Sequence, residues 1–417
     1  MFRSLAAVLT LLLFADPAHA QVRSAWIQMT GQGAEARAVV AGPCPSAMVD
    51  GQARPMRMRG VASADFPTVC TLAVPAPARS VSVGDQVMAL PQKDIRRIVI
   101  MGDTGCRITT YTVQACNDSR EWPFAAVSRL AAQSKPDLVI HVGDYYYRET
   151  ACPEGVTVCA GSPFGDRWDT WAAEFFDPAA PLLKAAPWIF ARGNHETCDR
   201  GGKGWFLLLD AAALPDRCRG VSDPFTVHAG DLNLHVMDSA NSADRSAPRG
   251  VVAGFVRQLD RLGAALDQGQ GWMVTHRPVW GMVPVARVGP IGPLRVGINL
   301  TEQKAIRGRP LGGVQMMVSG HIHDFQSLSF GPKRPAQLIV GTGGDVGEAA
   351  DTPKAYGGPT FIDDMDAVSL SFSRYGYFVM DKAEGQDWIG TFHDADDIVR
   401  ASCRLHERQL TCATPKT

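Results

Sequence analysis

The chain has 417 residues, of which 46% are hydrophobic and 20% are charged, and its formal net charge at pH 7 is −1. A near-neutral chain without a block of Lys or Arg gives no reason to expect nucleic acid or an anionic membrane as a partner. This length and this ordinary globular composition predict a large core and more than one domain.

Residues 1–20 have the features of a secretory signal peptide. Arg3 precedes an apolar stretch from Leu5 to Phe14, and the segment ends at Ala18-His19-Ala20, which is a small-x-small cleavage pattern. A membrane anchor is the alternative, but this stretch is too short to span a bilayer. We therefore expect a soluble protein that is exported, to the periplasm or outside the cell, and that has no membrane partner.

All ten cysteines follow this segment. An even number of cysteines in an oxidising compartment indicates disulfides. Thiolate metal ligands are the alternative, and the absence of any CxxC pair disfavours them. Each cysteine lies near one neighbour, which suggests the pairs Cys44–Cys70, Cys106–Cys116, Cys152–Cys159, Cys198–Cys218 and Cys403–Cys412.

Residues 21–95 are expected to form a small all-β domain. Runs such as "EARAVVAG", "TVCTLAVPA" and "ARSVSVGDQVMAL" are short and alternating or β-branched, and Gly and Pro separate them. This pattern is typical of short strands joined by turns. The stretch "PQKDIRR" is the expected hinge into the next domain.

Residues 96–417 have an α/β pattern. Buried strands are predicted at "RRIVIM", "DLVIHV", "WIFA", "DLNLHVM", "WMVT", "VQMMVS" and "AQLIV", and helices at "WPFAAVSRLAAQSKP" and "GFVRQLDRLGAALDQ". Alternating strands and helices predict layered sheets covered by helices. The tail contains hairpin-like segments, in "RYGYFVMDKAEGQDWIGTF" and in the stretch from Cys403 to Cys412.

Five of the predicted strands end in side chains that can bind a metal ion. In α/β sheets, ligands bind beyond the carboxyl ends of the strands. Taken alone, an Asp next to a Gly is commonly a turn former, and a single His is commonly structural. Five such endings in one domain indicate a shared site. The side chains are Asp103, Asp144 with Tyr147, Asn194 with His195 and Glu196, His276, and His321 with His323.

The order of these blocks resembles the purple acid phosphatases within the calcineurin-like metallophosphoesterase superfamily. The blocks are "GDTG", "GDYYY", "GNHE", "VTH" and "GHIH", and they extend from Gly102 to His323. The resemblance implies a four-layer α/β fold, in which two packed mixed β-sheets are flanked by helices. The small all-β domain before it is similar to the leader domain of many family members.

The resemblance also implies two metal ions. Asp103, Asp144, Tyr147 and His323 would hold the first ion. Asp144 would bridge to the second ion, and Asn194, His276 and His321 would complete that site.

Tyr147 is the distinctive ligand in this set. Most metallophosphoesterases have D-x-H in the first block, and here Gly105 occupies the His position. Tyrosine ionises only near pH 10, so a strongly charged cation is needed to displace its proton. We therefore expect Fe(III) at the first site, and a divalent ion (Zn, Mn or Fe(II)) at the second. Tyr145 and Tyr146 are expected to be packing or rim residues.

The implied reaction is in-line attack on phosphorus by a metal-bound hydroxide. His195 is the candidate proton donor to the leaving group and a candidate phosphate contact, together with Asn194. Glu196 is expected to orient His195, with a surface salt bridge as the alternative.

One position departs from the family. The substrate-facing histidine that many members carry nine or ten residues after "VTH" is replaced here by Val285 and Ala286. Arg277 or Arg287 is the candidate substitute for phosphate binding, and a surface role is the alternative.

Three functions are compatible with the sequence. The first is an exported phosphomonoesterase that acts on a small phosphorylated substrate. The second is a phosphodiesterase or nucleotide-cleaving enzyme with the same centre. The third is a non-catalytic exported binding protein with a vestigial metal site, which the complete ligand set disfavours. The sequence does not distinguish monoester from diester substrates, and it gives no oligomeric state.

Overall fold

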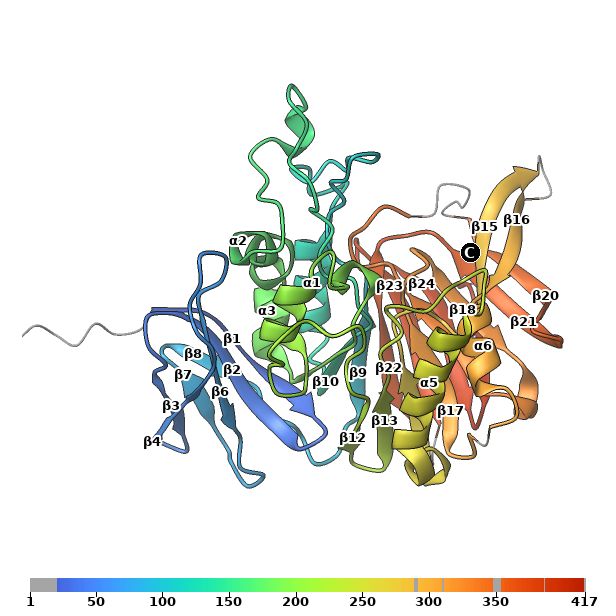
Figure 1. Cartoon of the computed structure of the whole chain (residues 1–417). Helices are drawn as coiled ribbons and strands as arrows, with labels where there is room; N and C mark the ends of the chain where they lie inside the picture. The colour runs from blue at the N-terminus through green and yellow to red at the C-terminus, as the bar shows by residue number, and fades with distance from the viewer. Residues whose placement is uncertain (1–20, 289–291, 310, 348–353, 386, 416–417) are drawn as a thin grey trace, which may run out of the picture.

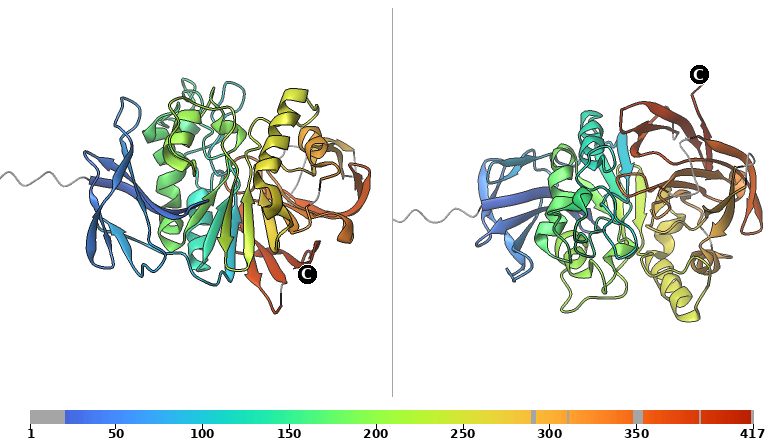
Figure 2. Two further views of the ribbon diagram at one scale, coloured as in Figure 1. Left: turned by 60° about the horizontal axis from the view of Figure 1, so that its bottom comes forward. Right: turned by 90° about the horizontal axis from the view of Figure 1, so that it is seen from above.

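The computed structural model describes residues 21–288, 292–309, 311–347, 354–385 and 387–415, and the signal peptide predicted at 1–20 lies outside them. Two large sheets pack face to face, and helices cover both outer sides (Figures 1 and 2). This is the four-layer α/β arrangement that was predicted. None of the described helices is long and apolar enough to cross a membrane.

The first sheet has eleven strands, and its centre is parallel. β9, β10 and β11 pair in parallel, and the antiparallel tail strands β22 to β25 extend the sheet from β9. The tail strands confirm the predicted hairpins. In sheet order the strands are β25 (Gln409–Ala413), β24 (Val399–His406), β23 (Trp388–Asp394), β22 (Gly376–Lys382), β9 (Arg97–Met101), β10 (Leu138–His141), β11 (Trp188–Phe190), β1 (Gln21–Thr30), β2 (Gly33–Ala41), β6 (Thr68–Ala73) and β5 (Arg57–Gly60).

The second sheet has eight strands and is mixed. Its parallel centre consists of β13, β14, β17 and β19. In sheet order the strands are β12 (Phe225–Ala229), β13 (Leu232–Val236), β14 (Gln270–Val274), β17 (Val314–Ser319), β19 (Ala336–Val340), β18 (Phe325–Ser329), β21 (Met365–Phe372) and β20 (Tyr356–Ile362). A separate hairpin, β15 (Gly281–Val288) and β16 (Gly292–Ile298), projects beyond this sheet (Figure 1).

The core lies between and outside the sheets because central strands such as β10, β11, β17 and β19 bury both of their faces. Side chains such as Ile100, Ile140, Trp272 and Leu338 fill the space between the two sheets. On the outer sides, α1 (Phe124–Gln133), α2 (Trp168–Trp171) and α3 (Asp177–Ala185) pack on the first sheet, and α5 (Arg249–Leu262) and α6 (Leu300–Ile306) pack on the second. Burial on both faces explains the continuous apolar strand sequences.

The N-terminal strands form an extra β unit that is continuous with the first sheet. A four-stranded sheet of β4 (Gln52–Pro55), β3 (Ser46–Val49), β7 (Val81–Val83) and β8 (Gln86–Met88) packs against β1 and β2. β1 also pairs in parallel with β11, with Gln28 opposite Trp188. The sequence did not predict this link, and a domain boundary at residue 95 stays a prediction.

The disulfide predictions are confirmed. The five bonds are Cys44–Cys70, Cys106–Cys116, Cys152–Cys159, Cys198–Cys218 and Cys403–Cys412.

Candidate metal centre

The predicted ligands follow strands that end at one common edge of the two packed sheets. Three of these strands belong to the first sheet and two to the second. Asp103 follows β9, Asp144 and Tyr147 follow β10, Asn194 follows β11, His276 follows β14, and His321 and His323 follow β17.

The backbone is strained where the chain leaves three of these strands. Asp103, Asp144 and His321 have positive φ angles of 55°, 58° and 70°. This conformation is uncommon for residues other than Gly, and it persists only where the surrounding structure enforces it. At the end of β11, a side chain on Gly193 would lie 2.0 Å from Asp144 Oδ1. Glycine is therefore required there for the approach of the Asp144 carboxylate.

The four residues predicted for the first metal converge on the hydroxyl of Tyr147. Tyr147 Oη lies 3.2 Å from Asp103 Oδ1, 3.0 Å from Asp144 Oδ2 and 3.1 Å from His323 Nε2. Tyr147 is fully buried. The structure thus brings together two carboxylates, a phenol and an imidazole from segments that are far apart in the sequence.

The remaining predicted ligands lie on the other side of Asp144. His276 Nε2 is 3.2 Å from Asp144 Oδ2 and 3.1 Å from Asn194 Oδ1. Ligand atoms of Asp144, His276 and His321 all lie within 4.8 Å of one another. Asp144 therefore belongs to both groups, as a bridging carboxylate must.

In two histidines, the ring nitrogen that faces away from the carboxylates lies against a backbone carbonyl. His276 Nδ1 lies 2.8 Å from the carbonyl oxygen of Val142, and His323 Nδ1 lies 2.7 Å from that of Val346. Metal-binding histidines usually donate their second N–H to a carbonyl or a carboxylate. These contacts fix the two rings with Nε2 toward the carboxylates.

The electrostatics around Asp103 and Asp144 favour cations, whereas burial and the nearby Arg277 lower the pKa of His321 to about 3. Burial alone lowers the pKa of His276, but the nearby carboxylate of Asp144 raises it to about 9. Burial likewise opposes the charge on His323, whereas Asp345 and Asp103 raise its pKa to about 10. The buried carboxylates thus stabilise positive charge on their neighbours, and this preference fits metal ions held by the same donors.

Asp345 and Arg107 were not predicted as part of the site. Asp345 Oδ2 lies 3.3 Å from His323 Nδ1, and the Asp345 carboxylate forms an ion pair with Arg107. The guanidinium carbon of Arg107 lies 4.7 Å from the centre of the Tyr147 ring. The signal in the sequence was the continuation of "AQLIVGTGG" into Asp345, another acidic residue after a strand end.

His195 lies beside the cluster, and its acidic partner is Glu149. The ring of His195 lies over that of Tyr147, with 3.9 Å between the centroids. His195 Nδ1 is 2.8 Å from Glu149 Oε1, and Arg200 Nε is 3.1 Å from the same oxygen. Burial opposes the ionisation of Glu149. The contact with His195 and the charge of Arg200 nevertheless keep the pKa of Glu149 below its usual value.

The prediction that Glu196 orients His195 does not agree with these contacts. Glu196 is fully buried, and its carboxylate accepts backbone N–H bonds from Gly193, Asp144, Tyr145 and Tyr146. The alternative of a surface salt bridge is excluded by this burial. Glu196 holds the two loops after β10 and β11 together, and the acidic side chain that contacts His195 is that of Glu149.

Arg277 lies at the second metal group but is not free. Its Nη1 is 2.5 Å from Asp244 Oδ2 and 2.8 Å from His321 Nε2, and Asp244 Oδ2 lies 3.2 Å from the same ring nitrogen. Asp244 was not predicted, because it follows no strand directly. The side chain of Arg287 lies outside the described part of the chain.

Tyr145 and Tyr146 are packing residues, as expected. Both are buried, and both stack on Trp171. The backbone N–H of Tyr147 is held by Glu174, which also accepts from Cys106. The loops after β9 and β10 are therefore tied to each other through one buried carboxylate.

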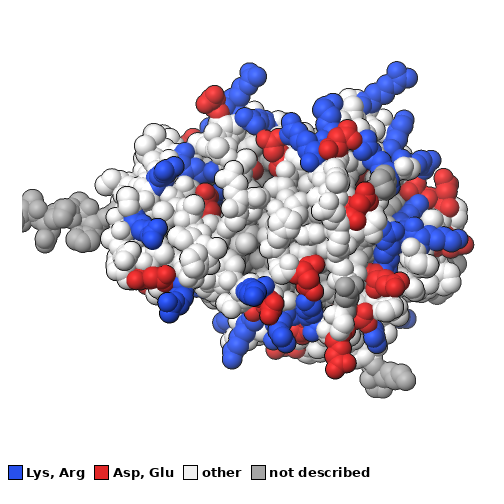
Figure 3. Space-filling model, turned by 90° about the horizontal axis from the view of Figure 1, so that it is seen from below, with Lys and Arg blue, Asp and Glu red and all other residues white. Residues whose placement is uncertain are grey.

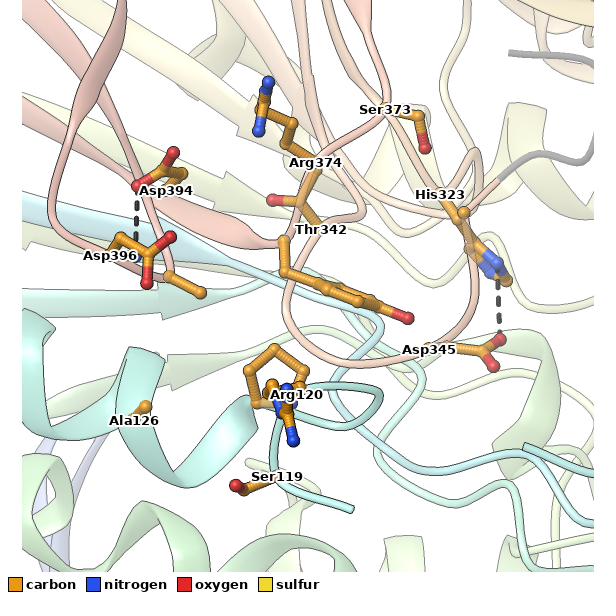
Figure 4. A pocket seen from close by; sticks show the side chains of 14 residues that line it. Ser119, Arg120, Ala126, His323, Thr342, Asp345, Ser373, Arg374, Asp394 and Asp396 are labelled. Atoms are coloured by element: carbon orange, nitrogen blue, oxygen red, sulfur yellow. Dashed lines mark hydrogen bonds and ion pairs between the residues drawn. The ribbon is translucent and has the colours of Figure 1, made fainter. Parts of the chain in front are cut away.

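A cavity of about 530 Å³ adjoins the cluster at His323 and Asp345 (Figure 4). Figure 4 shows the ion pair of these two residues at one end of the cavity and Asp394 and Asp396 at the other. Ser119 and Arg120 line the wall between them. The cavity reaches the predicted first metal group only through His323.

Comparisons with known proteins agree with this geometry. Residues 96–325, more than half of the chain, match the family described as calcineurin-like phosphoesterase. A search of curated proteins gave no match.

Two solved structures have a similar fold. Purple acid phosphatase PPD1 from yellow lupin (Lupinus luteus) seeds is 11% identical, with a TM-score of 0.56, and the alignment covers 95% of this chain and 74% of that one. PhoD is 10% identical in sequence, with a TM-score of 0.56, and the alignment covers 94% of this chain and 92% of PhoD.

Proposed function

The chain belongs to the calcineurin-like phosphoesterase family of metal-dependent phosphoester hydrolases, and from this premise we propose that it is an exported phosphomonoesterase with a dinuclear metal centre. The observation that carries the proposal is the position of Asp144, whose Oδ2 lies 3.0 Å from Tyr147 Oη and 3.2 Å from His276 Nε2. One carboxylate thus serves two complete sets of donors.

The donors fit two different ions. Asp103, Asp144, Tyr147 and His323 would hold Fe(III), because phenolate and carboxylate are hard anionic ligands. Asp144, Asn194, His276 and His321 would hold a divalent ion, namely Zn, Mn or Fe(II). When bound, the two ions would activate water and neutralise the charge of the phosphoryl group.

Residues of the chain itself supply the proton and position the substrate. His195 is the proposed proton donor to the leaving alkoxide, and Glu149 keeps its ring in place through the 2.8 Å contact. Asn194 and Arg277 are proposed to contact the phosphate. Arg277 suits this role because its guanidinium already lies beside His321, and arginine matches the geometry of phosphate oxygens.

Export is supported by the disulfides. Five disulfides within one chain are typical of an oxidising compartment. The expected substrate is small and phosphorylated, and no nucleic-acid partner is expected.

A substrate panel tests the proposal. Purified protein is assayed over about pH 4–9 with p-nitrophenyl phosphate, bis(p-nitrophenyl) phosphate and ATP, and its metal content is measured. We expect the monoester to have the highest kcat/KM, by about tenfold, which is 1.4 kcal/mol in the barrier. A faster diester reaction would identify a phosphodiesterase, and a metal-loaded but inactive protein would identify a binding protein.

A further inference from the structure

A second cavity, of about 460 Å³, lies on the second sheet apart from the metal centre. Among the described residues that line it, none is a predicted metal ligand. It forms where four connections meet, namely the end of α6, the short helix η7 (Gly331–Lys333), the β20–β21 turn and the β24–β25 turn. We refer to it as the basic pocket.

Positive charge predominates in the basic pocket. It is lined by five basic residues, Arg307, Arg309, Lys333, Arg334 and Arg408, and by two acidic residues, Asp363 and Asp364. Figure 3 shows basic side chains gathered toward the right of the lower face, with acidic ones among them. The net charge of the pocket depends on how many of these cations form ion pairs with carboxylates.

One carboxylate, Asp363, serves two arginines. Arg307 Nη2 lies 2.7 Å from Asp363 Oδ1, and Arg334 Nη2 lies 3.2 Å from Asp363 Oδ2. The same Oδ2 accepts the indole N–H of Trp280 at 3.0 Å. Asp364 is largely exposed, and its carboxylate lies 3.7 Å from Arg307. Both arginines therefore depend mainly on a single negative charge.

The other basic residues add charge that the pocket does not neutralise. Arg309 forms its ion pair with Asp260, at 2.7 Å. Arg408 donates to the backbone carbonyls of Leu311 and Gly312, which carry no net charge. Lys333 is exposed and has no ion pair with any described residue. Five cations thus face three carboxylates, with Asp260 included.

Arg334 is held in a way that keeps this charge in place. Its guanidinium carbon lies 4.6 Å from the centre of the Trp280 ring and 4.9 Å from that of Phe330. Burial lowers the pKa of Arg334, Asp363 opposes this shift, and the nearby Arg307 adds to it. Two guanidiniums are thus crowded around the single carboxylate of Asp363, and a further anion beside them would compensate the remaining positive charge.

We propose that the basic pocket binds a small oxyanion of the phosphate type, at a site separate from the catalytic centre. Lys333, Arg307 and Arg408 would meet the anion at the mouth, and Arg334 would support it from the wall. A small ligand fits because the positive charges surround a cavity and do not form an extended track, which nucleic acid would need.

Binding stoichiometry tests the proposal. Equilibrium dialysis with radiolabelled orthophosphate at low ionic strength measures the sites in the full protein, and sulfate is added as a competitor. We expect two sites per chain, of which one is lost in His276→Ala and the other is weakened about tenfold in Lys333→Gln/Arg307→Gln. The pocket site should lose affinity as salt rises, and sulfate should displace phosphate from it.

The controls separate folding and catalysis from anion binding. Arg129→Gln/Lys184→Gln neutralises two exposed charges on α1 and α3, and we expect it to retain both sites. The single change Lys333→Gln alters an exposed side chain and removes no ion pair within the described residues, and an unchanged thermal unfolding curve would show that its effect is on anion binding. A single site that disappears in His276→Ala and persists without Lys333 and Arg307 would overturn the inference. An inactive protein that keeps the pocket site would refute only the proposed function.

Discussion

Replacement of Glu149 by Gln tests whether His195 donates a proton to the leaving group. Glu149 Oε1 lies 2.8 Å from His195 Nδ1. The substitution keeps the size of the side chain but removes its charge. His195 then loses the charged partner that holds its ring. The metal donors are untouched, because the side chain of Glu149 forms no hydrogen bond or ion pair with any of them among the described residues; its backbone N–H, which the substitution keeps, donates to the carbonyl oxygen of Tyr147.

The size of the effect follows from this contact. The side chains of His195 and Glu149 are only 5% and 20% exposed, so solvent screens the pair weakly. A close contact with a buried charged group contributes about 1.5–3 kcal/mol. If that stabilisation is present in the transition state, its loss lowers turnover by about 10- to 150-fold. Arg200 shares Oε1 at 3.1 Å and limits how far the neutral side chain can reorient.

The assay compares leaving groups. An alkyl phosphate needs protonation of its departing oxygen, whereas p-nitrophenolate leaves without it. We expect Glu149→Gln to slow β-glycerophosphate hydrolysis by the full factor and p-nitrophenyl phosphate hydrolysis by less than about fivefold, with the metal content unchanged. Glu154→Gln, on the same loop and exposed, should match the parent. Equal losses on both substrates would refute the role of His195 as proton donor.

The remaining predictions concern metal binding and stability. Tyr147→Phe should abolish the visible absorption of an Fe(III)–phenolate, and a colourless, fully active parent enzyme would remove iron from the proposal. Asp244→Asn should weaken retention of the second metal about 10- to 100-fold in a chelator competition, because Asp244 Oδ2 lies 3.2 Å from His321 Nε2. Burial raises the pKa of Glu302 well above its usual value. A carboxyl group whose pKa is raised in the folded protein destabilises the fold as the pH rises above its pKa in the unfolded chain, which is about 4.3 for Glu. The free energy of unfolding of Glu302→Gln, measured in urea, should therefore equal that of the parent near pH 4 and exceed it at pH 8. Equal unfolding curves of the two proteins at both pH values would contradict this.

Much of the fold could be predicted because the central strands are buried on both faces. Such strands read as continuous apolar runs, as in "RIVIM" for β9 and "LVIH" for β10. The pairing of β1 with β11 could not be predicted in this way. It depends on one parallel contact, between Gln28 and Trp188, across a separation in sequence that no local pattern encodes.

The residues predicted as metal ligands could be brought together from the sequence for a similar reason. Each follows a strand end, and parallel strands end at the same edge. Their supporting carboxylates lack this signal. Glu149 follows the tyrosines in an irregular loop, and Asp244 lies between β13 and α5. The path of the loops in the folded protein, and not the local sequence, brings these carboxylates to their partners, His195 and His321. For the same reason, the sequence indicates Glu196, the neighbour of His195, and not Glu149 as the partner of His195.

The structure gives a steric reason for the use of a tyrosine in this centre. Most family members have a histidine two residues after the first aspartate, where this chain has Gly105. A side chain built on Gly105 would lie 2.6 Å from Cδ2 of Tyr147 and 2.9 Å from both Glu174 Oε1 and the carbonyl oxygen of Tyr145. A Cβ atom essentially never lies this close to another heavy atom. The ring of Tyr147 therefore occupies part of the space that a side chain at position 105 would need. A histidine at position 105 would therefore require the ring of Tyr147, the carboxylate of Glu174 and the backbone at Tyr145 all to move.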